Sequence, residues 1–284
     1  MKGRIKIIKS SGKEEDFNPD KLYNSLIRSG ASPEIAQTVM EEILPNISHY
    51  TKTREIYRLA YRRLKRLNHA SGMRYSLKKA LFKLGPSGYP FEQYFAELLK
   101  AYGYSTKVGQ LIKGQCIQHE VDIVAVNKDT VLVVECKYHN SAGRATNSKD
   151  ALYVDSRFRD LEPVFRKKYP DRDYSGWLVT NTRFSTDAIQ YARCAGYRLT
   201  SWRYPEKGGL EKMIEAKRLY PVTILSGIKA NLASHLIRQG IILLKDLTEM
   251  TVDEIMRVLD LPKKIATTIK WQADNLCLCN HNSK

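Results

Sequence analysis

The residues with the clearest chemical potential lie in 119–140, HEVDIVAVNKDTVLVVECKYHN. Asp122, Glu135 and Lys137 interrupt an otherwise apolar, valine-rich stretch. Because successive side chains on a strand point to opposite faces, Glu135 and Lys137 share one face and Cys136 lies on the other. Cys136 continues the apolar face, so we expect it to serve packing and not cysteine catalysis.

The turn NKDT sets how the two halves of this stretch pair. A symmetric turn pairs Val124 with Val133 and, two residues further on, Asp122 with Glu135. Two opposed carboxylates repel each other, which raises a pKa or requires a cation. Lys137 supplies one positive charge, and Mg²⁺ or Mn²⁺ with oxygen ligands would supply the rest. The spacing D-x12-E-x-K is loose, and an exposed hairpin edge with ordinary surface charges explains it equally well.

Alternating elements surround this pair and must position it. Glycine and Ser185 mark the ends of helices, and apolar runs between turn residues indicate strands. Helix is expected at 91–104, 150–169 and 185–196, and strand at 120–126, 131–137 and 176–181. The alternation predicts an α/β domain that begins after the linker GPSGYP at 85–90.

The two flanking regions are mostly helical in pattern. At the N-terminus, 4–9 alternates like a strand and 10–16 is expected to be a turn. Asn18 and Ser32 each precede a proline and are expected to cap helices, and further helices are expected at 53–67 and 71–85. From about 216 the chain predicts two short helix pairs. The tail spacing Cys277, Cys279, His281 is too cramped for an independent zinc site.

Composition narrows the class of protein. The net charge is +17, and residues 1–90 carry 18 Lys/Arg against 8 Asp/Glu. This excess favours a polyanionic partner, with nucleic acid first, although a solvated basic surface remains an alternative. No apolar run is long enough to span a bilayer, and five scattered cysteines suit a reducing compartment. We therefore expect a cytoplasmic protein.

Residues 88–205 resemble the PD-(D/E)xK nuclease superfamily in its Mrr-like, restriction-endonuclease-like branch. The resemblance rests on a helix that carries Glu92, a strand with Asp122, the strand VVECK, and the closing stretch GWLVTNTRFSTDAIQYARCAGYRL. It implies an α/β core with a mixed sheet. Val121 precedes the aspartate, where the family often has proline or glycine.

The same resemblance implies roles for individual residues. Asp122 and Glu135 would ligate Mg²⁺ or Mn²⁺ together with the backbone carbonyl of Cys136. Lys137 would orient the attacking water, and Glu92 would complete the acidic cluster. The implied reaction is metal-assisted phosphodiester hydrolysis.

Three further residues near the site have alternatives. Glu97 competes with Glu92 for the helix carboxylate, although a solvated helix position suits it better. His119 and His139 flank the site, and we expect them to be structural or phosphate-contacting residues and not bases.

The N-terminal region resembles the ATP-cone, a regulatory nucleotide-binding domain. Lys9, Gly12, Phe17 and Lys21 match its motif, whereas the sequence has two serines where the family has Arg-Asp. The resemblance implies binding of ATP or dATP and a homo-oligomer formed through this domain. The alternative is a degenerate cone kept as a basic DNA-binding or dimerising domain.

The C-terminal region resembles tandem helix-hairpin-helix modules, which hold the DNA backbone through hairpin amides. Gly227 matches the first hairpin glycine, whereas Lys229 and Asp260 stand at positions where glycine is expected. A plain helical interaction domain is the alternative.

The sequence thus predicts a multidomain protein with an α-helical ATP-cone-like domain at 1–86, a restriction-endonuclease-like nuclease domain at 87–212 and an α-helical DNA-binding domain at 213–284. The predicted function is a Mg²⁺-dependent DNA endonuclease that adenine nucleotide regulates. The competing hypothesis is a non-catalytic, nucleotide-sensing DNA-binding regulator with a vestigial nuclease fold.

Overall fold

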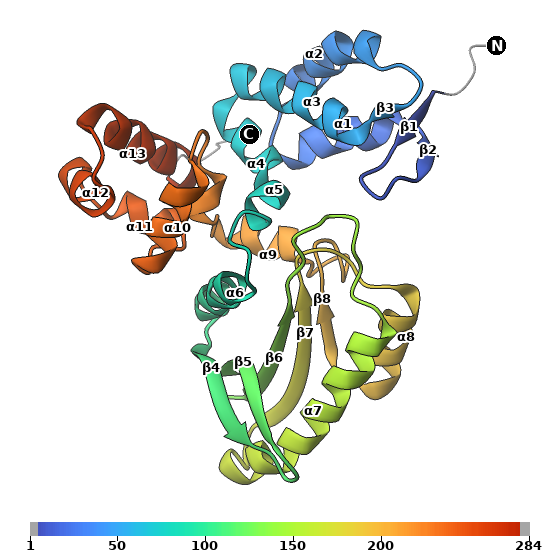
Figure 1. The fold of residues 1–284 in the computed structure, drawn as a ribbon, viewed down its shortest axis with the longest axis vertical. Helices are drawn as coiled ribbons and strands as arrows, with labels where there is room; N and C mark the ends of the chain where they lie inside the picture. The colour runs from blue at the N-terminus through green and yellow to red at the C-terminus, as the bar shows by residue number, and fades with distance from the viewer. Residues whose placement is uncertain (1–4, 279–284) are drawn as a thin grey trace.

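The computed structural model describes residues 5–278, so Cys279 and His281 of the tail lie outside the described residues. Figure 1 shows an α/β domain with the N-terminal helices on one side of its upper end and the C-terminal helices on the other, and α6 and α9 lie between these parts. Within 5–278 no helix combines the length and apolarity needed to cross a membrane. The predicted multidomain fold, with helical flanks around an α/β core, is confirmed.

The N-terminal helices begin where the sequence predicts. The side chain of Asn18 accepts from the backbone N–H of Lys21, and that of Ser32 accepts from the backbone N–H of Ile35. The elements are β1 (Lys6–Ile8), β2 (Glu14–Asp16), α1 (Pro19–Arg28), α2 (Pro33–Ile43), the short helix η1 (Leu44–Asn46), β3 (Thr51–Lys52) and α3 (Thr53–Leu67).

Two expectations for this region were wrong in detail. The segment expected to be a turn contains β2, which pairs antiparallel with β1, while β3 pairs with β1 in parallel. The helix expected at 71–85 is two helices, α4 (His69–Tyr75) and α5 (Leu77–Leu81). At Ser76 between them the hydroxyl donates to the carbonyl of Met73, a local bond that competes with the regular helix pattern.

The central sheet has the order β4-β5-β6-β7-β8 and is mixed, as predicted. The first three strands are antiparallel to one another, and β6, β7 and β8 run parallel. Helix α6 (Tyr89–Ala101) packs on one face of the sheet, and α7 (Ser148–Lys168) and α8 (Thr186–Ala195) pack on the other. The strands are β4 (Ser105–Lys113), β5 (Gln118–Val126), β6 (Thr130–Lys137), β7 (Asp173–Thr180) and β8 (Arg198–Thr200).

Strand β6 is the centre of this sheet and is covered on both faces. Leu132, Val134 and Cys136 pack toward α6, while Val131 and Val133 pack toward α7. This explains the long valine-rich run, because a strand buried on both faces has no polar side. The one acid that interrupts the α7 face of this strand, Glu135, is only 5% exposed.

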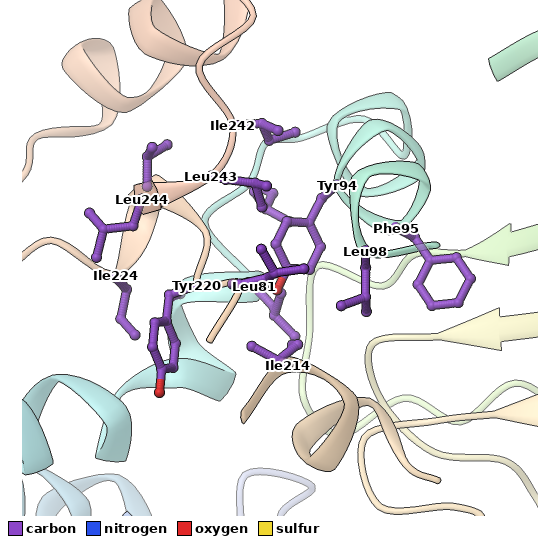
Figure 2. Close-up of a cluster of buried hydrophobic side chains, with 14 of the residues drawn as sticks. Leu81, Tyr94, Phe95, Leu98, Ile214, Tyr220, Ile224, Ile242, Leu243 and Leu244 are labelled. Carbon is purple, nitrogen blue, oxygen red and sulfur yellow. Dashed lines mark hydrogen bonds between the residues drawn. The ribbon is translucent and has the colours of Figure 1, made fainter. Parts of the chain in front are cut away.

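The C-terminal helices share a core with the α/β domain. Figure 2 shows Tyr94 and Leu98 of α6 beside Ile214 and Leu243, and the Tyr94 hydroxyl donates to the carbonyl of Leu219 at 2.7 Å. One buried cluster continues from Ala70 to Leu276. The elements are α9 (Leu210–Lys217), η2 (Val222–Ile224), α10 (Ala230–Arg238), α11 (Leu244–Thr248), α12 (Val252–Leu259) and α13 (Lys263–Cys277).

The loop between β6 and α7 reaches the N-terminal region (Figure 1). A Cβ added at Gly143 would lie 3.6 Å from the Cα of Ser11, which is ordinary van der Waals contact. Further back in the loop, the amide of Asn140 donates to the carbonyl of Pro86 at 3.1 Å. The loop that follows Lys137 therefore lies next to the turn between β1 and β2.

Candidate active site

The strand register at the candidate site is the one that the turn predicts. Val124 pairs with Val133, and Ile123 with Val134. Asp122 precedes Ile123 on β5. Its side chain, and not its backbone, bonds to β6: Oδ2 of Asp122 accepts a hydrogen bond from the N–H of Cys136 at 2.7 Å. This bond fixes one carboxylate oxygen at the point where the two strands separate.

Glu135 is held by two cations. Its Oε1 lies 3.1 Å from Nζ of Lys137, and its Oε2 pairs with a guanidinium N–H of Arg157 on α7. Arg157 also donates to the backbone carbonyl of Glu120 at 3.1 Å and to the hydroxyl of Tyr153, one helical turn earlier, at 3.1 Å. The sequence predicts that a positive charge lies near the paired carboxylates. Arg157, which was not among the predicted site residues, supplies part of that charge at Glu135.

The carboxylates of the site interact electrostatically. Burial and the charge of Glu135 raise the pKa of Asp122 to about 6. Burial, followed by the charges of Asp122 and Glu135, raises the pKa of Glu92 to about 7. The fold therefore brings the α6 carboxylate and the two strand carboxylates close enough that ionising one opposes ionising the others.

The residues fit a magnesium ion held mostly by water. Within residues 5–278 no group of three or more His, Cys, Asp or Glu side chains converges as a metal cage. Mg²⁺ does not need one, since it commonly keeps several waters and is held by one or two carboxylates. Asp122, Glu135 and the carbonyl of Cys136 would supply such a set, and Asp122 already has one oxygen fixed by the N–H of Cys136.

Comparisons with known proteins agree with this organisation. Family models match residues 5–78 as an ATP cone domain, 85–203 as a restriction endonuclease and 220–277 as AF1548-like, C-terminal. An uncharacterized protein of Archaeoglobus fulgidus is 36% identical over 179 residues, which are 63% of this chain and 97% of that protein. The chain belongs to the AF1548-like family.

A solved member of the same group gives the structural counterpart. The crystal structure of a protein of unknown function, AF1548, is 34% identical, with a TM-score of 0.57 over 67% of this chain and 98% of the other. The predicted succession of an ATP cone, a restriction-endonuclease-like domain and a helical C-terminal domain is therefore confirmed for this AF1548-like protein.

The remaining candidates near the site have other partners in the AF1548-like fold. Glu97 pairs with Lys100 at 2.6 Å on α6. His119 lies 2.7 Å from a carboxylate oxygen of Asp160, and His139 lies 3.0 Å from the hydroxyl of Thr146. These bonds give both histidines a role in local structure. The thiol of Cys136 is buried among apolar side chains, and its pKa is raised by that burial.

Part of the cone motif lines a cavity of about 270 Å³ in the N-terminal domain. Phe17 and Lys21 line it, together with Tyr57 of α3. Lys9 reaches its wall through an ion pair with Glu15, which also lies 3.2 Å from Lys21. These two lysines lower the pKa of Glu15.

Gly12 lies apart from this cavity, in the turn between β1 and β2. Its φ of 82° is a left-handed conformation that glycine adopts without strain. Its contribution is therefore to the shape of the hairpin that carries Lys9 and Glu15.

Proposed function

We propose that this AF1548-like protein is a Mg²⁺-dependent DNA endonuclease that hydrolyses phosphodiester bonds under the control of an adenine nucleotide. The observation that carries the proposal is the carboxylate pair at the centre of the sheet. Asp122 and Glu135 are the next residues after the last paired residues, Ile123 and Val134, and Asp122 accepts a hydrogen bond from the N–H of Cys136. Lys137 lies beside Glu135, in a domain that matches the restriction endonuclease family model. Glu135 is buried and Asp122 half-buried, and each carboxylate makes the charge of the other more costly, which favours a site that binds a further cation.

Each residue of the site has a distinct task in this proposal. Bound Mg²⁺ would polarise the phosphate and lower the pKa of the attacking water. Lys137, only two residues from Glu135, is within reach of the same phosphate and can stabilise its developing negative charge. Glu92, with a pKa of about 7, is suited to accept a proton near neutral pH. Arg157 is placed to orient Glu135 through their ion pair.

The charge distribution supports DNA as the substrate. The chain carries +17 overall, and phosphate neutralisation by Lys and Arg drives association with nucleic acid. In the C-terminal helices, Gly227 has φ 82° and Asp260 has φ 48°. Asp260 thus adopts the left-handed conformation of the hairpin glycine that it replaces, which supports backbone contacts to DNA by these turns.

Two contacts support control by nucleotide. The cone cavity lies beside Lys21 and Glu15, and a bound triphosphate would compete with Glu15 for that lysine. Glu15 belongs to β2, and the turn between β1 and β2 lies next to Gly143 in the loop that follows Lys137. A shift of this hairpin would therefore reach the nuclease site through one loop.

Cleavage of supercoiled plasmid by the purified protein with Mg²⁺ tests the proposal. We expect nicked or linear product from the wild type and a loss of at least about 100-fold in Asp122→Ala and Lys137→Ala. Glu97→Ala is the matched control, since Glu97 lies on the same helix as Glu92 and pairs with Lys100 instead. Cleavage that survives unchanged in both site variants would sink the assignment.

The same proteins separate the nuclease from the competing regulator hypothesis. A regulator would retard DNA in a gel shift with equal affinity in wild type and Asp122→Ala, and neither would cleave. ATP or dATP would then change DNA affinity alone. For the endonuclease, nucleotide is expected to change the cleavage rate, and Lys21→Ala is expected to abolish that response.

A further inference from the structure

A second cavity, of about 360 Å³, lies between the N-terminal domain and the α/β domain. Helices α1, α3, α4 and α5 form one side of it. The segment that contains Trp202 and Arg203, followed by α9, forms the other. Ala142, in the loop that follows Lys137, also lines it. Three parts of the chain that are distant in sequence therefore meet at this cavity.

The lining carries more positive than negative charge. Five cations, Arg28, Arg74, Lys78, Lys79 and Arg203, face two acids, Glu211 and Glu215. Both acids are already engaged, since Glu211 accepts two hydrogen bonds from Arg203, at 2.7 and 3.3 Å, and Glu215 accepts one from the hydroxyl of Tyr220 at 2.8 Å.

Three of the four cations on the N-terminal side are not paired in the same way. Within 5–278 the structure gives Arg28, Lys78 and Lys79 neither an ion pair with an acid nor a side-chain hydrogen bond. Burial and the nearby charge of Arg203 lower the pKa of Lys78. An anion in the cavity would raise the pKa of Lys78 again, because it would favour the charged ammonium.

Aromatic rings form the remaining walls. Tyr57 and Tyr75 stack with ring centroids 5.3 Å apart and an interplanar angle of 10°. On the opposite side Trp202, only 6% exposed, lies under the ammonium of Lys78, 5.8 Å from it. Unpaired cations beside flat rings are the combination that holds a phosphate attached to a planar base.

This cavity is distinct from the cone cavity, although the two share a wall. Ser25, Tyr57 and Tyr75 line both, so the tyrosine stack separates them. Lys21 belongs to the cone cavity, and Lys78 belongs to the one between the domains.

We propose that the cavity between the domains is a second ligand site, which binds a phosphorylated small molecule with a planar ring, a mononucleotide. Its volume lies within the range of about 300–1,000 Å³ that such ligands occupy. The phosphate would lie among Arg28, Lys78 and Lys79, and the ring would lie against the aromatic walls. A ligand in this cavity would contact the N-terminal domain, the α/β domain and the loop after Lys137. It would therefore favour the arrangement in which the two domains are packed together.

The test is binding to the full chain without DNA, which keeps it independent of nuclease activity. Calorimetric titration with AMP, ATP and inorganic phosphate is paired with tryptophan fluorescence. We expect a change in fluorescence on adding AMP that Trp202→Phe removes. Lys78→Met should weaken this binding at least about tenfold, whereas Lys21→Met should leave it unchanged and affect the cone cavity alone.

Two controls guard against loss of folding and against general charge effects. Lys212→Met removes an exposed lysine beside Glu211 and should bind as the wild type does. Arg28→Gln is a second site variant on a different helix, and thermal melting checks that each variant folds. The proposal would be overturned if the protein bound one equivalent of nucleotide, and if Lys21→Met abolished this binding while Lys78→Met left it intact. Equal affinity for phosphate and AMP would overturn the assignment of a planar ring.

Discussion

The carboxylate of Asp122 accepts a hydrogen bond of 2.7 Å from the backbone N–H of Cys136, the residue between Glu135 and Lys137. The bond ties the strand that carries one acid to the strand that carries the other. It also leaves the second oxygen of Asp122 available at the strand end. One carboxylate of the site is therefore anchored on the backbone of the strand that carries the other, whereas Glu135 itself is held by the side chains of Lys137 and Arg157.

Two substitutions of Asp122 should differ in stability, because only one of them can keep this hydrogen bond. Asp122→Asn can keep an oxygen acceptor for the Cys136 N–H, so we expect a melting temperature within about 2 °C of the wild type and cleavage reduced by at least about 100-fold. Asp122→Ala loses the acceptor and should lose stability by about 1–2 kcal/mol as well. Thermal melts and plasmid cleavage measure the two effects, and equal cleavage by Asp122→Asn and wild type would contradict the role of this carboxylate.

Removal of Arg157 should expose the cost of burying Glu135. In Arg157→Gln, Glu135 keeps Lys137 but loses its second cation, so we expect a loss of about 2 kcal/mol in metal-free buffer. Added Mn²⁺ should recover part of that loss, because it supplies the missing charge. Arg166→Gln is the control on the same helix, since its pair with Glu162 is exposed. An Arg157 variant as stable as this control would show that the pair contributes nothing.

Metal affinity should rise with pH. Protonated carboxyl groups do not bind Mn²⁺, and the pKa values of Glu92 and Asp122 are raised to about 7 and about 6. Calorimetry with Mn²⁺ between pH 5.5 and 8 should show Kd falling by up to about tenfold per pH unit for each proton released, and levelling above about pH 7.5. Affinity independent of pH over this range would exclude these groups from the site.

The raised pKa values of Glu92 and Asp122 also predict how the stability of the metal-free protein changes with pH. Both pKa values lie above those of the unfolded chain, so the folded protein binds more protons between about pH 4 and 7. This contribution stabilises the protein at the acidic end and is lost as the pH rises through the folded pKa values. Asp122→Asn should reduce the slope of melting temperature against pH in chelator, and an unchanged slope would contradict the assignment.

Tyr94 should control how firmly the C-terminal helices are attached. It is fully buried in the cluster that Figure 2 shows, and its hydroxyl donates to the carbonyl of Leu219. Tyr94→Phe leaves that carbonyl without this donor, and we expect a loss of about 1–2 kcal/mol in urea unfolding. Tyr102→Phe is the comparison, because its bond to the carbonyl of Met213 is partly exposed and should matter less. Tyr94→Phe with wild-type stability would show that the bond is dispensable.

What the sequence could predict is the part of the site that depends on local pattern. Strand alternation and a short turn define the register that pairs Ile123 with Val134, next to Asp122 and Glu135, and both are local properties. Helix starts at Asn18 and Ser32 follow from capping by the same logic.

What the sequence did not show depends on contacts between distant segments. Arg157 is 22 residues from Glu135 and lies on a helix with many other charges, so nothing local distinguishes it. The spacing Tyr153 to Arg157 was the available signal, since residues four apart meet on a helix. Strand β4 was missed because its alternation is weak in apolar residues, and its pairing with β5 stabilises it.

The buried clusters divide the chain unequally. The helices around α1, α2 and α3 have a cluster of their own, from Ile7 to Leu64, whereas α6, the sheet and the C-terminal helices share one. The first unit therefore has an apolar interior that does not depend on the sheet or on the C-terminal helices. The nuclease-like domain and the C-terminal helices depend on each other for stability, since either half alone would leave side chains such as Tyr94 and Leu98 facing water.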